Sequence, residues 1–434
     1  MKYDVAIIGG GIAGYCAALR CLESGLKTVL INQGHSSLHF SSGSIDVLSS
    51  LPNGQAIKDP FSGIHQLKEL SPEHPYSKMR VEEIQSSLKW FQTTLAKEGV
   101  SLSHSSDHNN HCRITPLGTL KSTWLSQPFV HQFHHKATFK RLVLVAIDGF
   151  RDFQPQLAFD NLSQIEAFQH IEKKILPIRI PGFESSRQNP NELRSIDISR
   201  ALKQPKAFSS LVHQLSDGAI KDDLVILPAI IGNGDGLTLM EQLQQLTQLN
   251  FHEVPTMPPS LLGIRIEEAL YRAFIRLGGI QLKGDKALSA KWYLNKPCIE
   301  SIQTANLEDF PLVAKHYILA SGSYFSHGLV AKSTQVVEPV FNLDVYFHQH
   351  RRQWRAKAFL SQQPHPFMQF GVVTNSQFSP SRNGQTISNL HCCGSVLSHY
   401  DPIHEGCGGG VAIASAYKVA ENIIHSMTSE EARV

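Results

Sequence analysis

A glycine turn between a short apolar run and a helical pattern is the feature that most constrains how this chain folds. Residues 2–8 read KYDVAII, an apolar, β-branched run that predicts a buried strand. The run leads directly into GGGIAG at residues 9–14, and the helical pattern YCAALRCLESG follows. Strand, glycine turn and helix in this order predict the first βαβ unit of a dinucleotide-binding fold.

The three glycines of the GxGxxG pattern have separate tasks in such a unit. Gly9 lets the chain turn tightly, and Gly14 lets the helix pack close to the strand. Gly11 lets the backbone approach a phosphate, because a Cβ at this position would stand in the way. The helix N-terminus then offers unpaired N–H groups and a positive dipole end to the anion. An ordinary glycine turn is the alternative, and the context favours phosphate binding over it.

The overall composition excludes several classes of protein. A length of 434 residues predicts two or three domains, and a net charge of +3 without a basic, aromatic stripe gives no indication of nucleic-acid binding. Seven cysteines without a CxxC pair disfavour a disulfide framework or a metal centre and favour a reducing cytosol. Met1 precedes the first strand directly, so we expect no signal peptide, and no apolar run has the roughly 18 residues needed to span a bilayer.

The end of the second expected strand lacks the residue that a dinucleotide fold usually places there. Leu26–Ile31 reads LKTVLI and predicts a parallel strand, which is followed by Asn32. An acidic residue is expected at this point to bind the adenosine ribose. Asn32 can still form a hydrogen bond with a hydroxyl group. However, the lack of an acidic residue weakens the inference that the ligand at the phosphate site is an adenine dinucleotide. FMN, which has a terminal phosphate and no adenosine, fits this gap better than FAD.

A serine-rich loop follows the second strand. Ser41, Ser42 and Gly43 lie in its centre, within residues 35–46. The loop is either a surface loop or a second phosphate-contacting loop whose hydroxyl and N–H groups face the cofactor.

Two cations stand out in the segment of residues 113–124, which reads RITPLGTLKSTW. Arg113 and Lys121, with the hydroxyl groups around them, are candidates to bind an anionic substrate or to cap a flavin. A β-hairpin with polar turns is the structural alternative, and residue pattern alone slightly favours it.

The middle of the chain predicts an α/β insertion. Apolar runs at residues 141–147, 174–180 and 223–230 alternate with helical patterns near 155–170, 197–216 and 238–249. Further helices are expected at 81–95 and 261–277, and a strand pair near 280–304.

The C-terminal part of the chain again contains predicted strands that are followed by glycine turns. Residues 316–326 predict a strand that ends at Ser321 and Gly322, and residues 387–394 predict another that ends at Gly394. Gly408 and Gly409 then open a long helix, which gives a second anion-accepting helix terminus. Such features at both ends of one chain predict a single nucleotide domain assembled from both termini, with insertions between them.

This layout resembles the two-dinucleotide-binding-domain flavoproteins. More specifically, six stretches resemble the B-subunit family of the anaerobic glycerol-3-phosphate dehydrogenases: LHFSSGSIDVLS, PEHPYS, RITPLGTLKSTWLS, PTMPPSLLGIR, LASGSYFSHGLVA and GSVLSHYDPIHEGCGGGVA. The resemblance spans nearly the whole chain. It implies that the N-terminal glycines hold the phosphate, while Ser321, Gly322 and the C-terminal glycines Gly394, Gly408 and Gly409 lie along the flavin.

The resemblance also implies a function. It implies a flavoprotein subunit, with FMN as the usual cofactor and FAD as the alternative, that oxidises sn-glycerol 3-phosphate to dihydroxyacetone phosphate and passes electrons to the quinone pool, for use with fumarate or nitrate. It implies a catalytic A subunit, an iron–sulfur C subunit that anchors the complex, and a cytoplasmic location on the inner face of the inner membrane through that partner. The remaining alternatives are a scaffold subunit without redox turnover, or a flavin reductase for another substrate.

Such a reaction needs a group that takes the C2 hydroxyl proton and cations that bind the phosphate. His399, Asp401 and His404 are the candidate bases, although Asp401 before Pro402 could equally form a turn. Arg113 and Lys121 are the candidate phosphate ligands, and no metal site is expected. The expected fold is α/β, with a Rossmann-like flavin-binding domain of residues 1–50, 258–330 and 385–434. Residues 51–257 and 331–384 are expected to form inserted substrate, cap and partner-contact regions.

Overall fold

The computed structural model describes residues 2–133, 139–183, 189, 192–232, 237–361 and 363–431. The chain forms two compact units. The first comprises Met1–Ser37, Ile45–Thr94 and Leu270–Val434, and the second comprises Leu38–Ser44 and Leu95–Ala269. The boundaries of these units differ from the expected domain boundaries. Residues 51–94 and 331–384, which were expected in the inserted regions, fall in the first unit, and residues 258–269, which were expected in the flavin-binding domain, fall in the second.

A five-stranded parallel sheet forms the centre of the first unit. Its order is β19-β12-β1-β2-β9, so strands from both ends of the sequence lie side by side. The strands are β1 (Lys2–Ile8), β2 (Thr28–Asn32), β9 (Ile280–Lys283), β12 (Val313–Leu319) and β19 (Leu390–Cys392). The inner strands are apolar because helices cover a parallel sheet on its faces. The prediction of an α/β nucleotide fold built from both termini is therefore confirmed.

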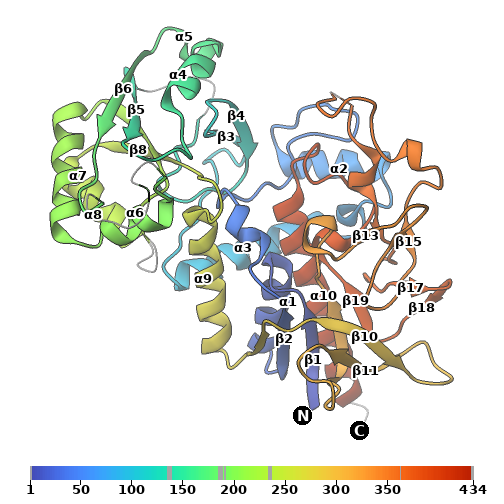
Figure 1. The fold of residues 1–434 in the computed structure, drawn as a ribbon. Helices are drawn as coiled ribbons and strands as arrows, with labels where there is room; N and C mark the ends of the chain where they lie inside the picture. The colour runs from blue at the N-terminus through green and yellow to red at the C-terminus, as the bar shows by residue number, and fades with distance from the viewer. Residues whose placement is uncertain are drawn as a thin grey trace. The chain divides into compact units, whose positions relative to one another are not determined.

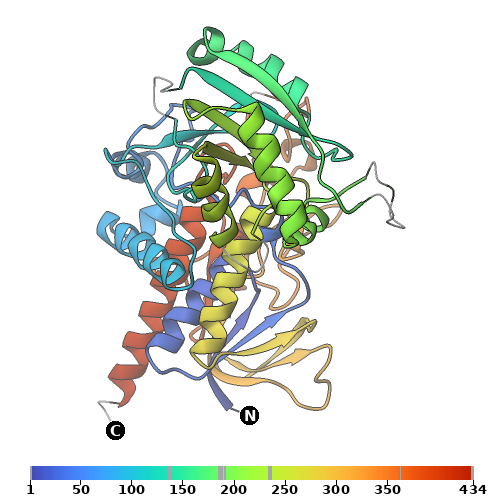
Figure 2. The same cartoon turned by 90° about the vertical axis from the view of Figure 1, so that its left-hand side faces the viewer.

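Two helices from opposite ends of the chain pack against each other beside this sheet. They are α1 (Ile12–Glu23) and α10 (Gly408–Glu431), which run side by side in Figures 1 and 2. An ion pair between Arg20 and Glu421 joins them. Small residues on α1, such as Ala17 and Ala18, are fully buried and permit a close approach of the two helices.

The remaining elements of the first unit are short helices, hairpins and two-stranded ladders. The helices are α2 (Pro60–Leu70), α3 (Val81–Lys97), η2 (Pro75–Lys78), η3 (Tyr324–Ser326), η4 (Arg351–Gln353), η5 (Pro366–Gln369) and η6 (Gly394–Val396). The strands are β10 (Ala287–Trp292), β11 (Ile299–Thr304), β13 (Val330–Ala331), β14 (Val336–Val337), β15 (Val345–Tyr346), β16 (Gly371–Val372), β17 (Ser381–Arg382) and β18 (Gln385–Thr386).

The second unit is built around a four-stranded parallel sheet of order β6-β5-β7-β8. The strands are β5 (Arg141–Ile147), β6 (Glu172–Ile178), β7 (Asp223–Pro228) and β8 (Asn250–Val254). Helices connect them, and α7 crosses in front of the sheet in Figure 2. The helices are η1 (Ser37–Phe40), α4 (Pro155–Ser163), α5 (Glu166–Gln169), α6 (Ser195–Ala201), α7 (Pro205–Gly218), α8 (Thr238–Thr247) and α9 (Leu261–Arg276), of which α9 continues into the first unit. The predicted α/β insertion is confirmed.

The structure also decides two local predictions, for residues 113–124 and for the strand pair near 280–304. Residues 113–124 form the β-hairpin of β3 (His111–Ile114) and β4 (Leu120–Thr123), which was the structural alternative. The expected strand pair near 280–304 exists as β10 and β11, but the preceding strand, β9, instead joins the central sheet beside β2.

The chain carries no candidate membrane span among the residues described, because none of those helices is both long and apolar enough. All seven cysteines are free thiols.

Candidate functional site

The predicted phosphate turn lies at the carboxyl end of β1, where α1 begins. Gly9 has a φ of +118°, and a Cβ there would collide with the carbonyl oxygen of Ala320. A Cβ on Gly14 would collide with the carbonyl oxygen of Gly9. Gly11 is the N-cap of α1, and a Cβ there would meet no atom of the described residues within 4 Å. Two of the glycines thus permit close backbone packing, and the third borders open space at a helix N-terminus, as a phosphate cradle requires.

The ends of β12 and β19 reach the same edge of the sheet. The Ser321 hydroxyl oxygen follows β12, and it is buried without a hydrogen-bond partner among the residues described. Gly394 follows β19, and its N–H donates to the Ser415 hydroxyl at 3.0 Å, while a Cβ there would contact Ala13 at the start of α1. An unsatisfied buried hydroxyl beside an open helix N-terminus fits a ligand with several acceptor oxygens. The residues present therefore fit a phosphate-bearing flavin.

Asn32 lies at the carboxyl end of β2, where an acidic ribose ligand would stand. Its Oδ1 accepts a hydrogen bond from Gln281 Nε2 at 2.8 Å, and its Nδ2 donates to the Gly34 carbonyl at 3.0 Å. Gln281 belongs to β9, the neighbouring strand. The amide therefore links β2 to β9, and much of its hydrogen-bonding capacity is used within the protein.

The centre of the serine loop, Leu38–Ser44, belongs to the second unit. Ser41 accepts a hydrogen bond from the Gly43 N–H at 3.0 Å, and the Gly43 carbonyl accepts one from Gln127. Ser42 is half-buried. These contacts give the loop a defined shape, and its role as a second phosphate loop stays a prediction.

Gly408 and Gly409 begin α10, and they are closely packed. A Cβ on Gly408 would lie 3.0 Å from Pro402, and one on Gly409 would lie 3.1 Å from Ile45. The Gly410 N–H donates to the Asp46 carbonyl at 2.8 Å. These glycines fasten the helix start to the end of the serine loop, at Ile45 and Asp46. Their contact with a flavin stays a prediction.

The loop before α10 carries all three candidate bases. His399 has a φ of +67°, an uncommon conformation that clusters at functional sites. Burial lowers the pKa of His399, so its ring is neutral near pH 7 and able to accept a proton. The Asp401 carboxylate accepts hydrogen bonds from the N–H groups of Ile403 and His404, at 3.0 and 2.9 Å. These contacts are those of a turn former.

The ring of His404 offers a buried nitrogen to a ligand. Its Nε2 is buried and lacks a hydrogen bond among the described residues. A buried ring nitrogen without a partner usually faces a ligand or water. His399 and His404 are therefore better candidates for the base than Asp401, whose oxygen already caps a turn.

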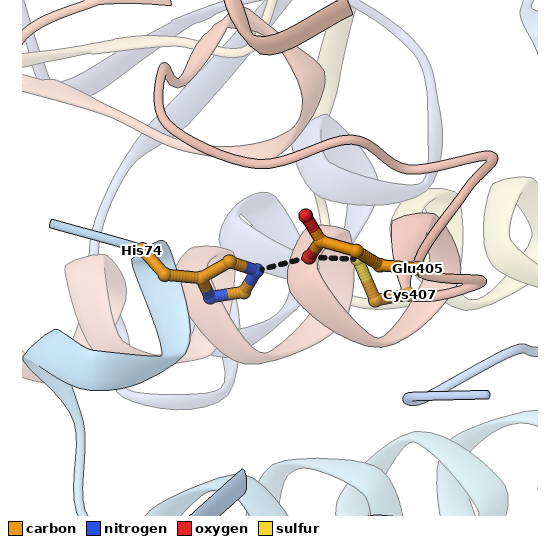
Figure 3. A group of neighbouring side chains, drawn as sticks. All are labelled: His74, Glu405 and Cys407. Atoms are coloured by element: carbon orange, nitrogen blue, oxygen red, sulfur yellow. Dashed lines mark hydrogen bonds and ion pairs between the residues drawn. The ribbon is translucent and has the colours of Figure 1, made fainter. Parts of the chain in front are cut away.

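A buried group of three side chains contacts the loop before α10 that carries the candidate bases. In Figure 3 the His74 ring points toward the Glu405 carboxylate, and the Cys407 thiol meets the same carboxylate. The His74 Nε2 lies 3.0 Å from Glu405 Oε2, and the Cys407 sulfur lies 3.7 Å from it. The other Glu405 oxygen accepts the Asp401 N–H at 3.0 Å.

Hydrogen bonding defines the protonation of this group. The His74 Nδ1 accepts the Tyr76 N–H at 3.0 Å, so the proton of the neutral ring is on Nε2 and points at Glu405. A metal ion could bind that nitrogen only by displacing this proton. Burial, followed by the charge of Glu405, raises the pKa of the Cys407 thiol well above its usual range. The group therefore acts as a hydrogen-bonded support for the loop that carries His399 and His404.

Lys78 is a residue near this loop that the sequence patterns did not identify. Its ammonium group donates to the Thr374 carbonyl at 2.7 Å and lies 3.6 Å from Glu73, and its charge acts on His399. Burial lowers the pKa of Lys78. The sequence signal was its position directly after the PEHPYS stretch, but a single lysine gives no pattern by itself.

The two predicted substrate cations lie in the second unit. Arg113 on β3 stands directly opposite Lys121 on β4, so the structure brings this pair together. Arg113 is buried and Lys121 is half-buried. His252 lies close enough for the Arg113 charge to act on it. The candidate bases belong to the first unit.

A family model and several relatives match this chain over most of its length. A family model described as an FAD binding domain matches residues 4–411. The B subunit of an anaerobic glycerol-3-phosphate dehydrogenase from Vibrio vulnificus is 57% identical over 99% of both chains. A protein of the same name from Yersinia pestis is 39% identical over 98% of this chain and 99% of the relative. A solved 3-ketosteroid delta1-dehydrogenase from Sterolibacterium denitrificans has a TM-score of 0.45 at 9% identity, covering 98% of this chain and 100% of that one.

Proposed function

Because this chain belongs to the B-subunit family of the anaerobic glycerol-3-phosphate dehydrogenases, within the FAD-binding flavoproteins, we propose that it carries the flavin of an enzyme that oxidises sn-glycerol 3-phosphate to dihydroxyacetone phosphate. The observation that carries the proposal is the 57% identity over 99% of both chains. The open helix N-terminus at Gly11 supports it, since a flavin phosphate needs such a site.

The proposed enzyme is a complex. The relatives are named as one lettered component of a dehydrogenase, which implies other subunits, and we propose that these are a catalytic A subunit and an iron–sulfur C subunit. The C subunit would hold the complex on the inner face of the cell inner membrane. Electrons would pass from the flavin through the C subunit to the quinone pool, with fumarate or nitrate as the final acceptor.

In this proposal a bound flavin supplies the acceptor for the hydride that leaves C2 of the substrate. The chain's own task is to hold the C2 hydroxyl proton and the phosphate. His399 is the first candidate for the proton, because burial keeps its ring neutral, and His404 is the second, because its Nε2 lacks a protein partner among the residues described. Asp401 and Glu405 position the loop. Lys78, or Arg113 with Lys121, would bind the phosphate.

We propose FMN as the flavin, with FAD as the alternative. The description of the matching family names FAD. The argument for FMN is Asn32, because its amide is engaged with Gln281 and Gly34 and replaces the acid that binds an adenosine ribose. FMN needs a phosphate site and no ribose ligand there. To distinguish FMN from FAD, the chromophore is released with acid and its mass is measured. The mass of FAD would overturn the FMN proposal.

The redox role has its own experiment. Anaerobic addition of glycerol 3-phosphate to the purified, flavin-loaded chain should bleach the flavin absorbance if this chain oxidises the substrate itself. Bleaching only after the A subunit is added would mean that this chain relays electrons. A chain that cannot be loaded with FMN or FAD would indicate a scaffold role, and a flavin that responds only to other substrates would indicate a different reductase.

A further inference from the structure

A short surface segment of the first unit combines exposed cations with two exposed apolar side chains. It comprises residues 351–360, RRQWRAKAFL, and is termed here the basic–apolar loop. It follows β15 in the orange part of the chain in Figure 1. Phe359 is 86% exposed and Leu360 is 90% exposed, which is far from the usual placement of large apolar residues. The loop is not part of the candidate site described above.

The charge around this loop is of one sign. It carries four cations within seven residues: Arg351, Arg352, Arg355 and Lys357. All four are exposed, and none is in an ion pair within the part of the chain that the structure describes. No Asp or Glu occurs in the sequence between Asp344 and Asp401. The chain as a whole is nearly neutral, so this is a local concentration of positive charge.

Hydrogen bonds hold the loop in its shape. The His365 Nδ1 accepts the Ala356 N–H at 3.1 Å, and its Nε2 donates to the Phe359 carbonyl at 3.0 Å. The Trp354 indole N–H donates to the His348 carbonyl at 2.6 Å, and the Phe367 N–H donates to the Trp354 carbonyl at 2.8 Å. The two apolar side chains are therefore presented from an anchored backbone. Less conformational entropy is lost when such a preorganised surface binds.

A cavity of about 330 Å³ opens beside the loop, within the first unit. Its walls are mainly apolar, and two guanidinium groups and a phenol border it. The Tyr324 hydroxyl is buried without a hydrogen-bond partner among the residues described. Arg351 lies over the Trp354 ring at 4.7 Å. The lining residues are Tyr324, Ala331, Arg351, Trp354, Arg355 and Phe367.

We propose that the basic–apolar loop binds an anionic lipid surface directly. Phe359 and Leu360 enter the boundary between headgroups and acyl chains, while the cations meet lipid phosphates. The adjoining cavity accepts an apolar segment of one lipid and places its phosphate near Arg351 and Arg355. The unpartnered Tyr324 hydroxyl supplies a donor to a headgroup oxygen.

A lipid fits these observations better than an acidic protein partner does. Stable protein interfaces bury their apolar anchors within a broad, packed patch, and lysine is depleted in them. Here two bulky side chains are 86% and 90% exposed, in the same ten-residue segment as four exposed cations that include a lysine. That arrangement is typical of segments that insert shallowly into an anionic membrane surface. The proposal goes beyond the function above, in which a partner provides the attachment.

The experiment uses the purified full-length chain without its partners. It is sedimented with vesicles of pure phosphatidylcholine and with vesicles containing phosphatidylserine, at low and at high salt. We expect binding to the anionic vesicles only, and a loss of binding as salt increases, because screening weakens attraction to the surface charge. The Phe359→Trp variant should show a blue-shifted emission on the same vesicles, which reports entry of this side chain into the membrane.

Paired variants test the two halves of the loop. Phe359→Ser with Leu360→Ser, and Arg352→Glu with Arg355→Glu, should each weaken vesicle binding about tenfold or more. Leu294→Ser, at a fully exposed apolar residue, is the control for the first pair. Lys140→Glu with Arg200→Glu, at exposed cations, changes the net charge equally and is the control for the second. Circular dichroism and the melting temperature establish that each variant is folded.

The outcomes separate the possible sources of affinity. The proposal is overturned if the wild-type chain ignores anionic vesicles at low salt, or if both loop variants bind as the controls do. It is equally overturned if inorganic phosphate at millimolar concentration abolishes binding while salt of equal ionic strength does not, since free phosphate would then be the ligand. Binding of the loop to an isolated protein partner, without any binding to vesicles, would assign the surface to a protein.

Discussion

At the scale of single residues, Gly11 and Gly14 place opposite demands on a side chain. A Cβ on Gly14 would collide with the Gly9 carbonyl, whereas one on Gly11 would meet nothing within 4 Å in the part of the chain that the structure describes. Gly11 has a φ of −87°, which alanine adopts readily. The requirement for glycine at 14 is therefore structural. At 11 no atom of the described residues demands glycine, and the flavin phosphate is the proposed reason for it.

This difference predicts separate effects for two substitutions. Gly14→Ala should reduce the free energy of unfolding by about 1–3 kcal/mol, since backbone must move to admit the methyl group. Gly11→Ala should keep the wild-type melting temperature in the flavin-free chain and weaken flavin binding about tenfold or more. Thermal unfolding and flavin titration measure the two effects. Gly34→Ala, also with open space around its Cβ, is the control; unchanged flavin affinity in Gly11→Ala would refute the phosphate cradle.

A second residue-scale prediction concerns His252 in the second unit. Its Nδ1 accepts the His131 N–H at 3.0 Å and its Nε2 donates to the Ile114 carbonyl at 3.1 Å, so the folded ring is neutral. Burial lowers its pKa to about 3 from the usual 6.5. Between these values the unfolded chain binds the proton and the folded chain does not. Stability should therefore fall as the pH decreases through this window, by about 1.4 kcal/mol per pH unit for this group.

Urea unfolding between pH 7 and pH 4.5 measures this slope. His252→Gln should be less stable than the wild type at pH 7, because a buried hydrogen-bond network is disturbed, but its stability should depend less on pH. His213→Gln, at an exposed histidine of α7, should leave the slope as it is in the wild type. An equal slope in His252→Gln and the wild type would show that the ring is not held neutral.

At the scale of secondary-structure elements, a buried ion pair ties α9 to β8. The side chains of Arg265 and Glu253 are almost completely buried. The guanidinium group of Arg265 donates two hydrogen bonds to the Glu253 carboxylate, at 2.7 and 2.9 Å. Arg265 also donates to the Gln127 side chain at 3.1 Å and to the Ile231 carbonyl at 2.5 Å. Gln127 in turn donates to the Leu262 and Gly43 carbonyls. One guanidinium group therefore organises α9, β8 and the serine loop.

Breaking one side of this pair should be more damaging than removing both. Glu253→Gln leaves the Arg265 charge buried without its counter-ion, and should cost about 3–5 kcal/mol of unfolding free energy. Replacement of both, by Arg265→Met with Glu253→Leu, should cost less than the sum of the single changes. Denaturant unfolding of the four proteins in this cycle gives the coupling. Additive costs would contradict a direct interaction between the two side chains.

The elements themselves were largely predictable, and their pairing was less so. Strands such as β1, β5 and β7 are continuous apolar runs, which is the pattern of a strand buried on both faces. The short β9 has no such pattern, since its side chains are half-buried or exposed, and its place beside β2 depends on long-range pairing. For residues 113–124 the turn residues at 115–118 indicated the hairpin, but no residue pattern indicated that Arg113 would be buried.

At the scale of the whole molecule, the sequence predicted the glycine turns of the candidate site better than the long-range side-chain contacts that hold the site in place. Glycine turns leave a local signature, and those at Gly9, Ser321 and Gly394 proved to share one edge of the sheet because their strands are neighbours. His74 and Glu405 are 331 residues apart in sequence and have no local signature that pairs them. The importance of Lys78 likewise arises only from the fold. Long-range contacts of this kind decide which candidate base is already engaged, as Asp401 is, and which is available.

The division of the chain into two units yields the last prediction. The second unit has its own core, in which apolar residues of β5, β7, α7 and α8 are buried together, all between Ile114 and Val254. The buried pair of α9 and β8 lies in the same unit. By contrast, the residues that fit a phosphate, at Gly11, Ser321 and Gly394, all belong to the first unit.

A fragment of residues 98–276 should therefore fold but carry no flavin. It includes the whole of α9 and the four-stranded sheet, so it should unfold cooperatively on heating, and Glu253→Gln should lower its melting temperature as in the full chain. Absorbance near 450 nm should be absent even after incubation with FMN or FAD, whereas the full chain should take up one of them. Because the fragment lacks the glycine turn but retains Arg113 and Lys121, flavin binding by it would move the main cofactor contacts to the second unit. A folded fragment without flavin would leave the parallel sheet of the first unit as the place where the cofactor is held.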